Sequence, residues 1–159
     1  MVAEKPSLAQ SLALILSDHK CSSRKGATTL TYNKYTITNH VIIYLGFNGA
    51  CSVHEWTGSY KGEAAYFKMT SVCGHINSLD FPAKFNNWDT VDPVELFRCP
   101  TEKKEATPKL KMPAFLASEA KGSHHAVLWL DCDKEGENIC FEVAHDNLND
   151  LFPILNMNK

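Results

Sequence analysis

The sequence lacks the patterns that would place it in several specialised classes of protein. Its six cysteines include no CxxC pair, and none of them combines with the seven histidines at the spacing of a zinc module. A zinc module and a disulfide framework are therefore excluded, and we expect reduced thiols in the nucleus and/or the cytoplasm. There is no secretory signal and no apolar run of membrane-spanning length, so we expect no membrane contact.

A strong excess of charge of one sign is also lacking. The formal net charge is -2, so no global basic field attracts nucleic acid. Any such contact has to come from local patches or from another part of a larger protein. What the chain does have is 44% apolar residues in 159 positions, which is enough for one packed domain of ordinary size.

A helix is predicted close to the N-terminus. Apolar residues recur there at helical spacing, at Leu8, Leu12, Ile15 and Leu16. Ser7 and Gln10 have the spacing of a capping box, which predicts where this helix begins.

The next part of the chain predicts strands and then a region rich in loops. Residues 50–57 and 64–72 are β-like runs joined by the turn sequence GSYKG, which is typical of a hairpin. Prolines then interrupt residues 80–112. They leave room only for short helices, at about residues 94–97 and 113–120.

Acidic residues follow two predicted strands. Residues 125–130 have the length of a buried strand, the acids of DCDKE come directly after it, and helical spacing resumes at Glu137. This order of strand, acidic turn and helix is an α/β unit. Glu4 similarly follows a strand stub of Val2 and Ala3. Because ligands bind at the carboxyl ends of parallel strands, we expect both acidic ends to contribute to one site.

The acidic turn predicts a site for a hard cation. Asp131 and Asp133 are two residues apart, so in an extended chain their carboxylates point to the same side and can share an ion. Mg²⁺ is the natural candidate, because it is usually held by one or two carboxylates together with a phosphate oxygen. Lys5 and Lys134 would supply positive charge for that phosphate.

A calcium-binding EF-hand is an alternative interpretation of the same turn. Positions 1, 3, 5, 6 and 12 of such a loop would be Asp131, Asp133, Glu135, Gly136 and Glu142. Glu135 departs from the usual Asp or Asn. An EF-hand also needs a helix immediately before its loop, whereas a short apolar run precedes this one.

Five segments, spread over most of the chain, carry a more specific signal. In chain order they are MVAEKPSLAQSLALIL, FNGACSVHEWTG, FKMTSVCGHINSLDF, PTEKKEATPKLKM and VLWLDCDKEGENICFEV. Together they resemble the N-terminal Toprim domain of type IA DNA topoisomerases, in the eukaryotic topoisomerase III beta branch. The resemblance implies an α/β, Rossmann-like Toprim fold with a small, mostly parallel sheet flanked by helices. We expect this domain at residues 1–146 and the start of a following region at residues 147–159.

The resemblance also implies an activity and a set of site residues. Type IA topoisomerases are isomerases that break one DNA strand by attack of a tyrosine, pass another strand and reseal without ATP. Single-stranded DNA, with RNA as a further candidate, and a tudor-domain protein are the partners that the family suggests. The implied catalytic residues are a general acid/base carboxylate, a transition-state lysine and an acidic magnesium-binding triad, at Glu4, Lys5, Asp131, Asp133 and Glu135. Metal would be held by Glu4, Asp131 and Asp133, and His75 and Lys134 are candidate nucleic-acid contacts.

Three departures from the family pattern limit this expectation. The first strand is almost missing, because the family has several more apolar residues before MVAEKPS. Residues 27–46 are an insertion without resemblance, which we expect to form an excursion or an added edge segment outside the site. None of the five tyrosines matches the family's nucleophile. We therefore predict that this chain alone is inactive, and a non-catalytic Toprim fragment that binds only metal or partners stays an alternative.

Overall fold

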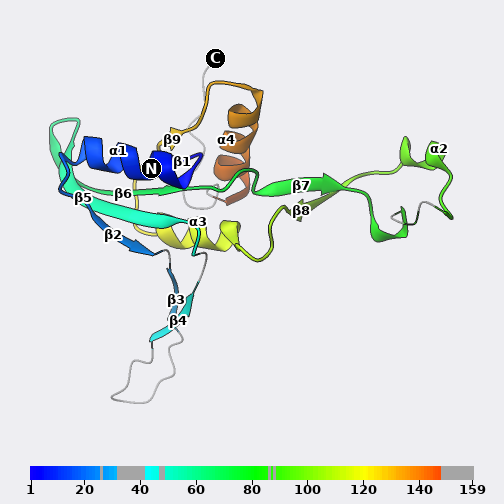
Figure 1. Ribbon diagram of the computed structural model, residues 1–159, viewed down its shortest axis with the longest axis horizontal. Coiled ribbons are helices and arrows are strands. Elements are labelled where there is room, and N and C mark those ends of the chain that lie inside the picture. Colours follow the sequence, from blue (N-terminus) through cyan, green and yellow to red (C-terminus); the bar gives the residue numbers. More distant parts are fainter. Residues whose placement is uncertain (26, 32–41, 47–48, 86, 88, 148–159) are drawn as a thin grey trace.

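The fold is built on a mixed five-stranded sheet (Figure 1). The computed structural model describes residues 1–25, 27–31, 42–46, 49–85, 87 and 89–147. In spatial order the strands are β2 (Ser22–Lys25), β5 (Ser52–Tyr60), β6 (Glu63–Ser71), β1 (Val2–Ala3) and β9 (Leu128–Trp129). β1 is parallel to both of its neighbours, β6 and β9, whereas β2, β5 and β6 pair in antiparallel fashion. The predicted α/β class is confirmed, with its parallel pairs at the end of the sheet that carries Glu4.

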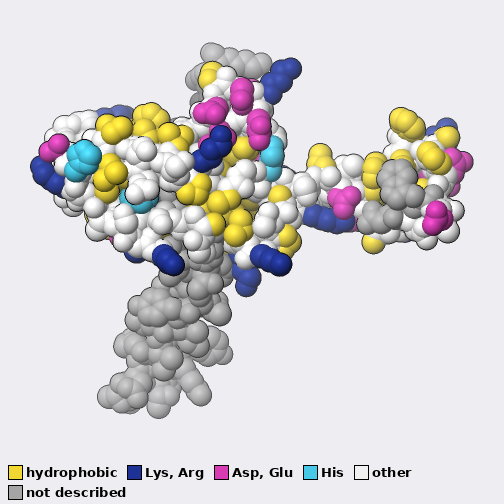
Figure 2. Space-filling model, in the orientation of Figure 1, with side chains coloured by type: hydrophobic (Ala, Val, Ile, Leu, Met, Phe, Trp, Pro, Cys, Tyr) yellow, Lys and Arg dark blue, Asp and Glu magenta, His cyan; other side chains and the backbone are white. Residues whose placement is uncertain are grey.

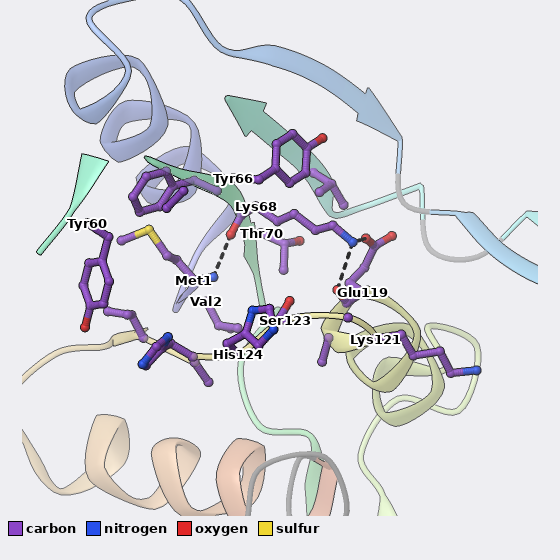
Figure 3. Close-up of a pocket in the computed structure, with 18 of the residues that line it drawn as sticks. Met1, Val2, Tyr60, Tyr66, Lys68, Thr70, Glu119, Lys121, Ser123 and His124 are labelled. Carbon is purple, nitrogen blue, oxygen red and sulfur yellow. Dashed lines mark hydrogen bonds and ion pairs between the residues drawn. The ribbon is translucent and has the colours of Figure 1, made fainter. Parts of the chain in front are cut away.

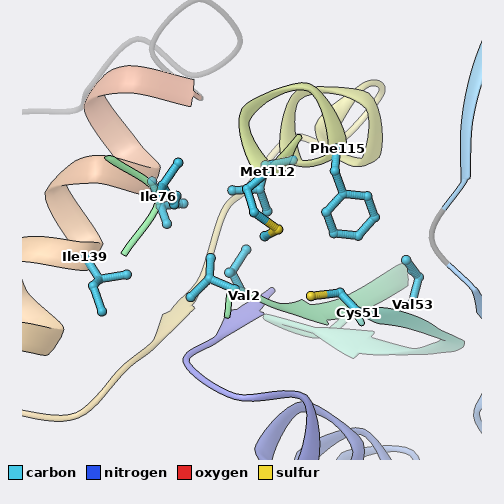
Figure 4. Close-up of a cluster of buried hydrophobic side chains, with 10 residues drawn as sticks. Val2, Cys51, Val53, Ile76, Met112, Phe115 and Ile139 are labelled. Atoms are coloured by element: carbon cyan, nitrogen blue, oxygen red, sulfur yellow. The ribbon is translucent and has the colours of Figure 1, made fainter. Parts of the chain in front are cut away.

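Helices cover both faces of this sheet. α1 (Pro6–Leu16) packs on one face, and α3 (Met112–Ala120) and α4 (Lys134–Asn147) pack on the other. Val2 and Ala3 point to opposite faces of β1 and so join different clusters, with Val2 beside Phe115 and Ile139 under α3 and α4 (Figure 4). Among the described residues, no helix has the length and apolar character to cross a bilayer.

The predicted helix near the N-terminus is confirmed, but its start and its buried face differ from the prediction. Lys5 is the N-cap and makes no side-chain capping bond, and Pro6 opens the first turn, so the predicted capping box is wrong. Ala9 and Ala13 are the buried residues of the helix, whereas Ile15 is 71% exposed. The small side chains of Ala9 and Ala13 let the helix lie close to the sheet. The buried face of the helix therefore leaves out Ile15 and Leu16, which were predicted to belong to it.

The predicted hairpin of β5 and β6 is confirmed. Tyr60 pairs with Glu63, so the turn consists of Lys61 and Gly62, which have φ angles of 53° and 87°. Two consecutive positive φ angles are the geometry that matches the twist of a two-residue hairpin, and a glycine adopts them without steric cost.

The loop-rich middle contains the two short helices that were predicted, α2 (Pro93–Leu96) and α3, and a 3-10 turn at Ala83–Phe85. It also contains a feature that the sequence did not predict. β7 (Asn77–Asp80) and β8 (Glu102–Glu105) pair in antiparallel fashion and extend from the body as an arm that carries α2 (Figure 1). The expectation of loops and helices alone was therefore wrong here.

The segment that we expected to be an insertion, residues 27–46, contains a second antiparallel pair outside the central sheet. β3 (Ala27–Thr31) pairs with β4 (Ile42–Gly46), and the pair projects away from the body, on a different side from the β7–β8 arm (Figure 1). β3 lies beside α3. Residues 32–41 of this segment, and residues 148–159 of the expected following region, lie outside the described residues.

All six cysteines are free thiols. The sulfur atom of Cys73, in the loop that follows β6, lies 3.3 Å from the sulfur atom of Cys51. Burial, together with the neighbouring Cys51, raises the pKa of Cys73 to about 12, so this thiol stays protonated at neutral pH.

Candidate active site

The ends of β1 and β9 meet at one edge of the sheet, as the sequence predicted. Ala3 pairs in parallel with Trp129, so the residues that follow the two strands are neighbours. Glu4 is buried, and its Oε2 atom accepts a hydrogen bond of 3.4 Å from the backbone N–H of Asp131. This contact joins two positions that are 127 residues apart in the chain. The edge therefore brings a fixed carboxylate next to the acidic turn.

Lys5 places a cation at the same edge. Its Nζ atom lies 3.3 Å from Oε1 of Glu4, and its side chain is largely exposed. The Glu4 carboxylate, with smaller contributions from Asp131 and Glu135, raises the pKa of the Lys5 ammonium group. Lys5 thus stays charged at neutral pH and is accessible to an anion in solvent.

The acidic turn is more sharply bent than the sequence suggested. The strand ends at Trp129 and α4 begins at Lys134, with a bend at residues 132–133 between them. Oδ1 of Asp133 accepts a hydrogen bond of 2.7 Å from the N–H of Gly136, so this side chain caps α4. The expectation that Asp131 and Asp133 are neighbours in an extended chain was wrong.

A glycine is required at position 136, because the backbone of Asp131 lies very close to it. A β-carbon at position 136 would overlap the carbonyl oxygen of Asp131. Any larger residue would push the start of α4 away from the end of β9. The glycine therefore lets the first turn of α4 lie against the backbone of Asp131.

The EF-hand interpretation is wrong. A 12-residue calcium loop needs a helix before it and a non-helical chain through most of its length. Here a strand precedes the acids, and α4 already begins at Lys134. Glu142, which would be the last ligand, points from α4 to the loop after β6 and binds Ile76 and Asn77 there.

His75 lies beside the acidic turn, and a residue that sequence reasoning missed holds it there. Nε2 of His75 is 3.8 Å from Oε1 of Glu135, and its Nδ1 is 3.0 Å from Oε1 of Glu142. Glu142 is buried, although it was considered only as a calcium ligand. Its position between Ile139 and Val143, on the apolar side of α4, is the sequence signal that could have revealed a structural role.

Comparison with known proteins agrees with this geometry. Residues 1–154 match the Toprim domain family. The chain belongs to the Toprim family. It is 55% identical over 157 residues to DNA topoisomerase 3-beta-1 of Mus musculus and of Homo sapiens, which covers 98% of this chain. It is 54% identical over 144 residues to DNA topoisomerase 3-beta of Drosophila melanogaster. The predicted resemblance is confirmed, and the chain spans only about 15% of the length of these relatives.

The acidic edge of this Toprim fold has the chemistry of a magnesium site, although not a preformed one. Asp131, Asp133 and Glu135 are exposed, and Figure 2 shows acidic side chains gathered over α4 with basic groups beside them. Within the described ranges, no three His, Cys, Asp or Glu side chains are already grouped to hold a metal ion. Carboxylate oxygens are the ligands that Mg²⁺ prefers, so the donor set of this edge fits that ion.

A cavity of the Toprim fold lies away from the acidic edge. It has a volume of about 600 Å³ and lies at the amino end of β1, between β6 and residues 123–127 (Figure 3). The Met1 ammonium group donates a hydrogen bond of 2.6 Å to the carbonyl oxygen of Lys68 beside it. Burial, with a smaller contribution from the Lys68 charge, lowers the pKa of this amine to about 6. No predicted site residue lines this cavity, so the candidate site lies outside it.

Proposed function

We propose that this chain forms the magnesium-binding half of a type IA DNA topoisomerase active site. One observation carries the proposal: buried Glu4 and its partner Lys5 meet the acidic turn at the carboxyl edge of a parallel sheet. Similarity to DNA topoisomerase 3-beta-1 over 98% of the chain supports the reaction type. The attacking tyrosine would come from another part of a full-length protein.

Each residue at the edge has a distinct role in this reaction. Glu4 is buried next to a backbone donor, which suits a carboxylate that exchanges a proton with the oxygen atoms at the cleaved bond. Lys5 is a permanent, exposed cation that stabilises charge on the phosphate.

Glu4, Asp131 and Asp133 would hold Mg²⁺, with Glu135 as the third acid of the turn. When bound, Mg²⁺ supplies positive charge beside the phosphate that is cleaved. The exposed side chains of Asp131 and Glu135 have room to turn toward the ion, whereas Glu4 is fixed.

Contacts to the rest of the substrate are part of the same proposal. His75 lies at the acidic edge, and Lys134 is exposed at the first residue of α4, so we expect both to contact phosphate groups of single-stranded DNA. RNA is the second candidate substrate. A tudor-domain partner and a location in the nucleus and/or the cytoplasm follow from the family resemblance and from the reduced cysteines.

A second candidate function is a non-catalytic Toprim fragment that binds only metal or partners. The observation that favours it is the place of the two tyrosines on the β5–β6 hairpin. Tyr60 and Tyr66 lie on the β5–β6 hairpin, beside the cavity at the amino end of β1, and not at the acidic edge.

Metal binding is tested by thermal unfolding. Millimolar Mg²⁺ should raise the melting temperature of the chain, because it binds the folded state preferentially. Asp131→Asn with Asp133→Asn should abolish this rise, and asparagine at position 133 preserves the helix cap. The matched control removes two exposed acids elsewhere, Asp18→Asn with Asp89→Asn, and should keep the rise. An equal rise in the acidic-turn variant would place the metal at another site.

Activity is tested with supercoiled plasmid and labelled single strands in the presence of Mg²⁺. The chain alone should give no relaxation and no covalent adduct, since its acids and lysine have no positioned nucleophile to assist. Adding the remaining domains of a relative in trans should restore both, and Glu4→Gln should then abolish cleavage. Failure of a well-folded mixture would favour the non-catalytic fragment. An adduct that maps to a tyrosine of this chain would contradict the proposal.

A further inference from the structure

The cavity at the amino end of β1 lies where a longer β1 would continue. β1 contains only Val2 and Ala3, whereas its neighbour β6 begins at Glu63. The cavity has a volume of about 600 Å³ and lies beside this first part of β6, with residues 123–127 along its other side (Figure 3). We call the space between residues 64–68 and residues 123–127 the strand slot.

The backbone of β6 is directed into the strand slot. The Met1 ammonium group donates a hydrogen bond of 2.6 Å to the carbonyl oxygen of Lys68, and the N–H of Thr70 donates one of 3.0 Å to the carbonyl oxygen of Met1. Because the backbone groups of successive strand residues alternate in direction, those of Ala64 and Tyr66 point to the same side. An extended chain in the slot would therefore continue the parallel ladder that Met1 begins.

The other walls of the slot suit an extended apolar chain. The N–H of Val2 donates a hydrogen bond of 2.8 Å to the carbonyl oxygen of Val127, so this side also presents backbone groups to β1. Leu116 and Ala120 of α3 line the slot on the face of the sheet to which Val2 points. Alternate side chains of a strand point to opposite faces, so every second side chain of a chain in the slot would pack against α3.

The strand slot ends at a cationic group that lacks a counter-charge. In a polypeptide that begins at Met1, its ammonium group lies beside Lys68, and no carboxylate in the described part of the chain forms an ion pair with it. Glu119 also lines the cavity, but Arg24 and Lys68 already bind its carboxylate. Burial and the Lys68 charge lower the pKa of the Met1 amine to about 6. A ligand that brings a negative charge to this point would offset both effects.

We propose that, in a polypeptide that begins at Met1, the strand slot binds the C-terminal end of an extended apolar peptide, which runs parallel to β6 and brings its free carboxylate to the Met1 amine. Strand addition and capture of a terminal carboxylate are both known modes of peptide recognition. Backbone hydrogen bonds supply affinity, and the carboxylate determines the direction of the peptide. This site is separate from the acidic edge and does not depend on the reaction proposed there.

The first experiment tests the carboxylate. A peptide of alternating valine and alanine, about five residues long and fluorescently labelled at its amino end, is titrated with the chain and followed by anisotropy. The free acid should bind about tenfold more tightly than the same peptide with a C-terminal amide, because a hydrogen bond to a charged group is lost in the amide. Equal affinities of the two peptides, or no binding of either, would overturn the proposal.

The second experiment tests the backbone of β6. Tyr66→Pro removes the N–H that points into the slot, and Tyr66→Ala is its matched control, because it removes the same ring and keeps the N–H. Tyr66 is 60% exposed and its N–H points away from β5, so we expect both variants to fold, which thermal unfolding checks. Tyr66→Pro should bind the free-acid peptide about three- to tenfold more weakly than Tyr66→Ala. Equal affinities of the two folded variants would contradict strand addition.

The third experiment locates the peptide and does not depend on the folding of Tyr66→Pro. A chain extended at the N-terminus by a few apolar residues has an amide in place of the Met1 amine and can fill the slot itself, so it should not bind the peptide. In the unextended chain, a carbodiimide should join the peptide carboxylate to the Met1 amine with loss of one water, and peptide mass mapping should place the adduct at Met1. Unchanged binding by the extended chain, or coupling only to lysines, would overturn the proposal.

Discussion

The acidic edge of the central sheet and the β3–β4 hairpin are supported in opposite ways. At the edge, β1 is paired on both sides, Glu4 is buried, and α4 rests on Ile139 and Val143, both fully buried. In the described part of the chain, β3 and β4 pair only with each other, and the hairpin projects from the body. The core thus supports the candidate site directly, whereas the β3–β4 hairpin lies outside the central sheet.

The position of the hairpin explains how the sheet accommodates it. Lys25 at the end of β2 is already paired with Ser52 at the start of β5. Any segment inserted between these two residues begins and ends at neighbouring points on the surface. The cost of closing such a loop grows only slowly with its length. The acidic edge does not tolerate an insertion in this way, because its contacts join residues that are distant in the sequence.

The largest loss of stability is expected from a substitution in the part of the core that supports the acidic edge. Ile139→Ala removes a fully buried side chain that packs in the same cluster as Val2, and should lower the free energy of unfolding by about 3 kcal/mol. Urea denaturation measures the loss. Phe141→Ala is the control, since Phe141 is 55% exposed on the same helix, and should change stability by less than about 0.5 kcal/mol. Equal losses would contradict the packing described for α4.

Local patterns predicted the parts of the fold whose own sequence carries the signal. The β5–β6 hairpin has β-like runs and a Gly-containing turn, and helical spacing marks α1 and α4. The meeting of Glu4 with the acidic turn could also be predicted, because the carboxyl ends of neighbouring parallel strands share one edge.

The elements that were missed depend on partners distant in the sequence. β7 and β8 have the sequences NSLD and EKKE, which are polar and mostly exposed, so no apolar alternation indicates a strand. Glu142 binds the backbone 66 residues earlier, at Ile76. No local pattern encodes such a contact. The capping box at Ser7 failed because Pro6, one residue earlier, already opens the helix.

A second prediction concerns the other end of β1. In a polypeptide that begins at Met1, burial lowers the pKa of the amine to about 6 in the folded state, from 8.0. The unfolded state then binds more protons between these two pH values, so the free energy of unfolding should rise with pH across this range. The increase is about 2.7 kcal/mol for a shift of two pKa units. Urea denaturation at a series of pH values measures it.

The control for this prediction is a chain extended at the N-terminus by a few apolar residues. His54 also contributes a rise with pH, because burial lowers its pKa, so the difference between the two chains is the informative quantity. The extension removes the buried charge and can continue β1 into the cavity of about 600 Å³ beside β6. We expect the extended chain to be more stable and less dependent on pH. The same pH dependence in both chains would show that Met1 is not its source.

The smallest effect is expected from deletion of residues 27–46. Because Lys25 and Ser52 are already paired, joining the remaining ends should keep β2 and β5 in register and change the free energy of unfolding by less than about 1 kcal/mol. The substitution Arg24→Ala in the neighbouring strand β2 gives a loss of stability with which the deletion can be compared. Arg24 binds Glu119, which is buried, through two hydrogen bonds of 2.9 and 2.6 Å, and its loss leaves that carboxylate without this partner. This substitution should therefore cost more than the whole deletion. If the deletion costs more than Arg24→Ala, the contact of β3 with α3 is part of the core, and the contrast between the edge and the hairpin fails.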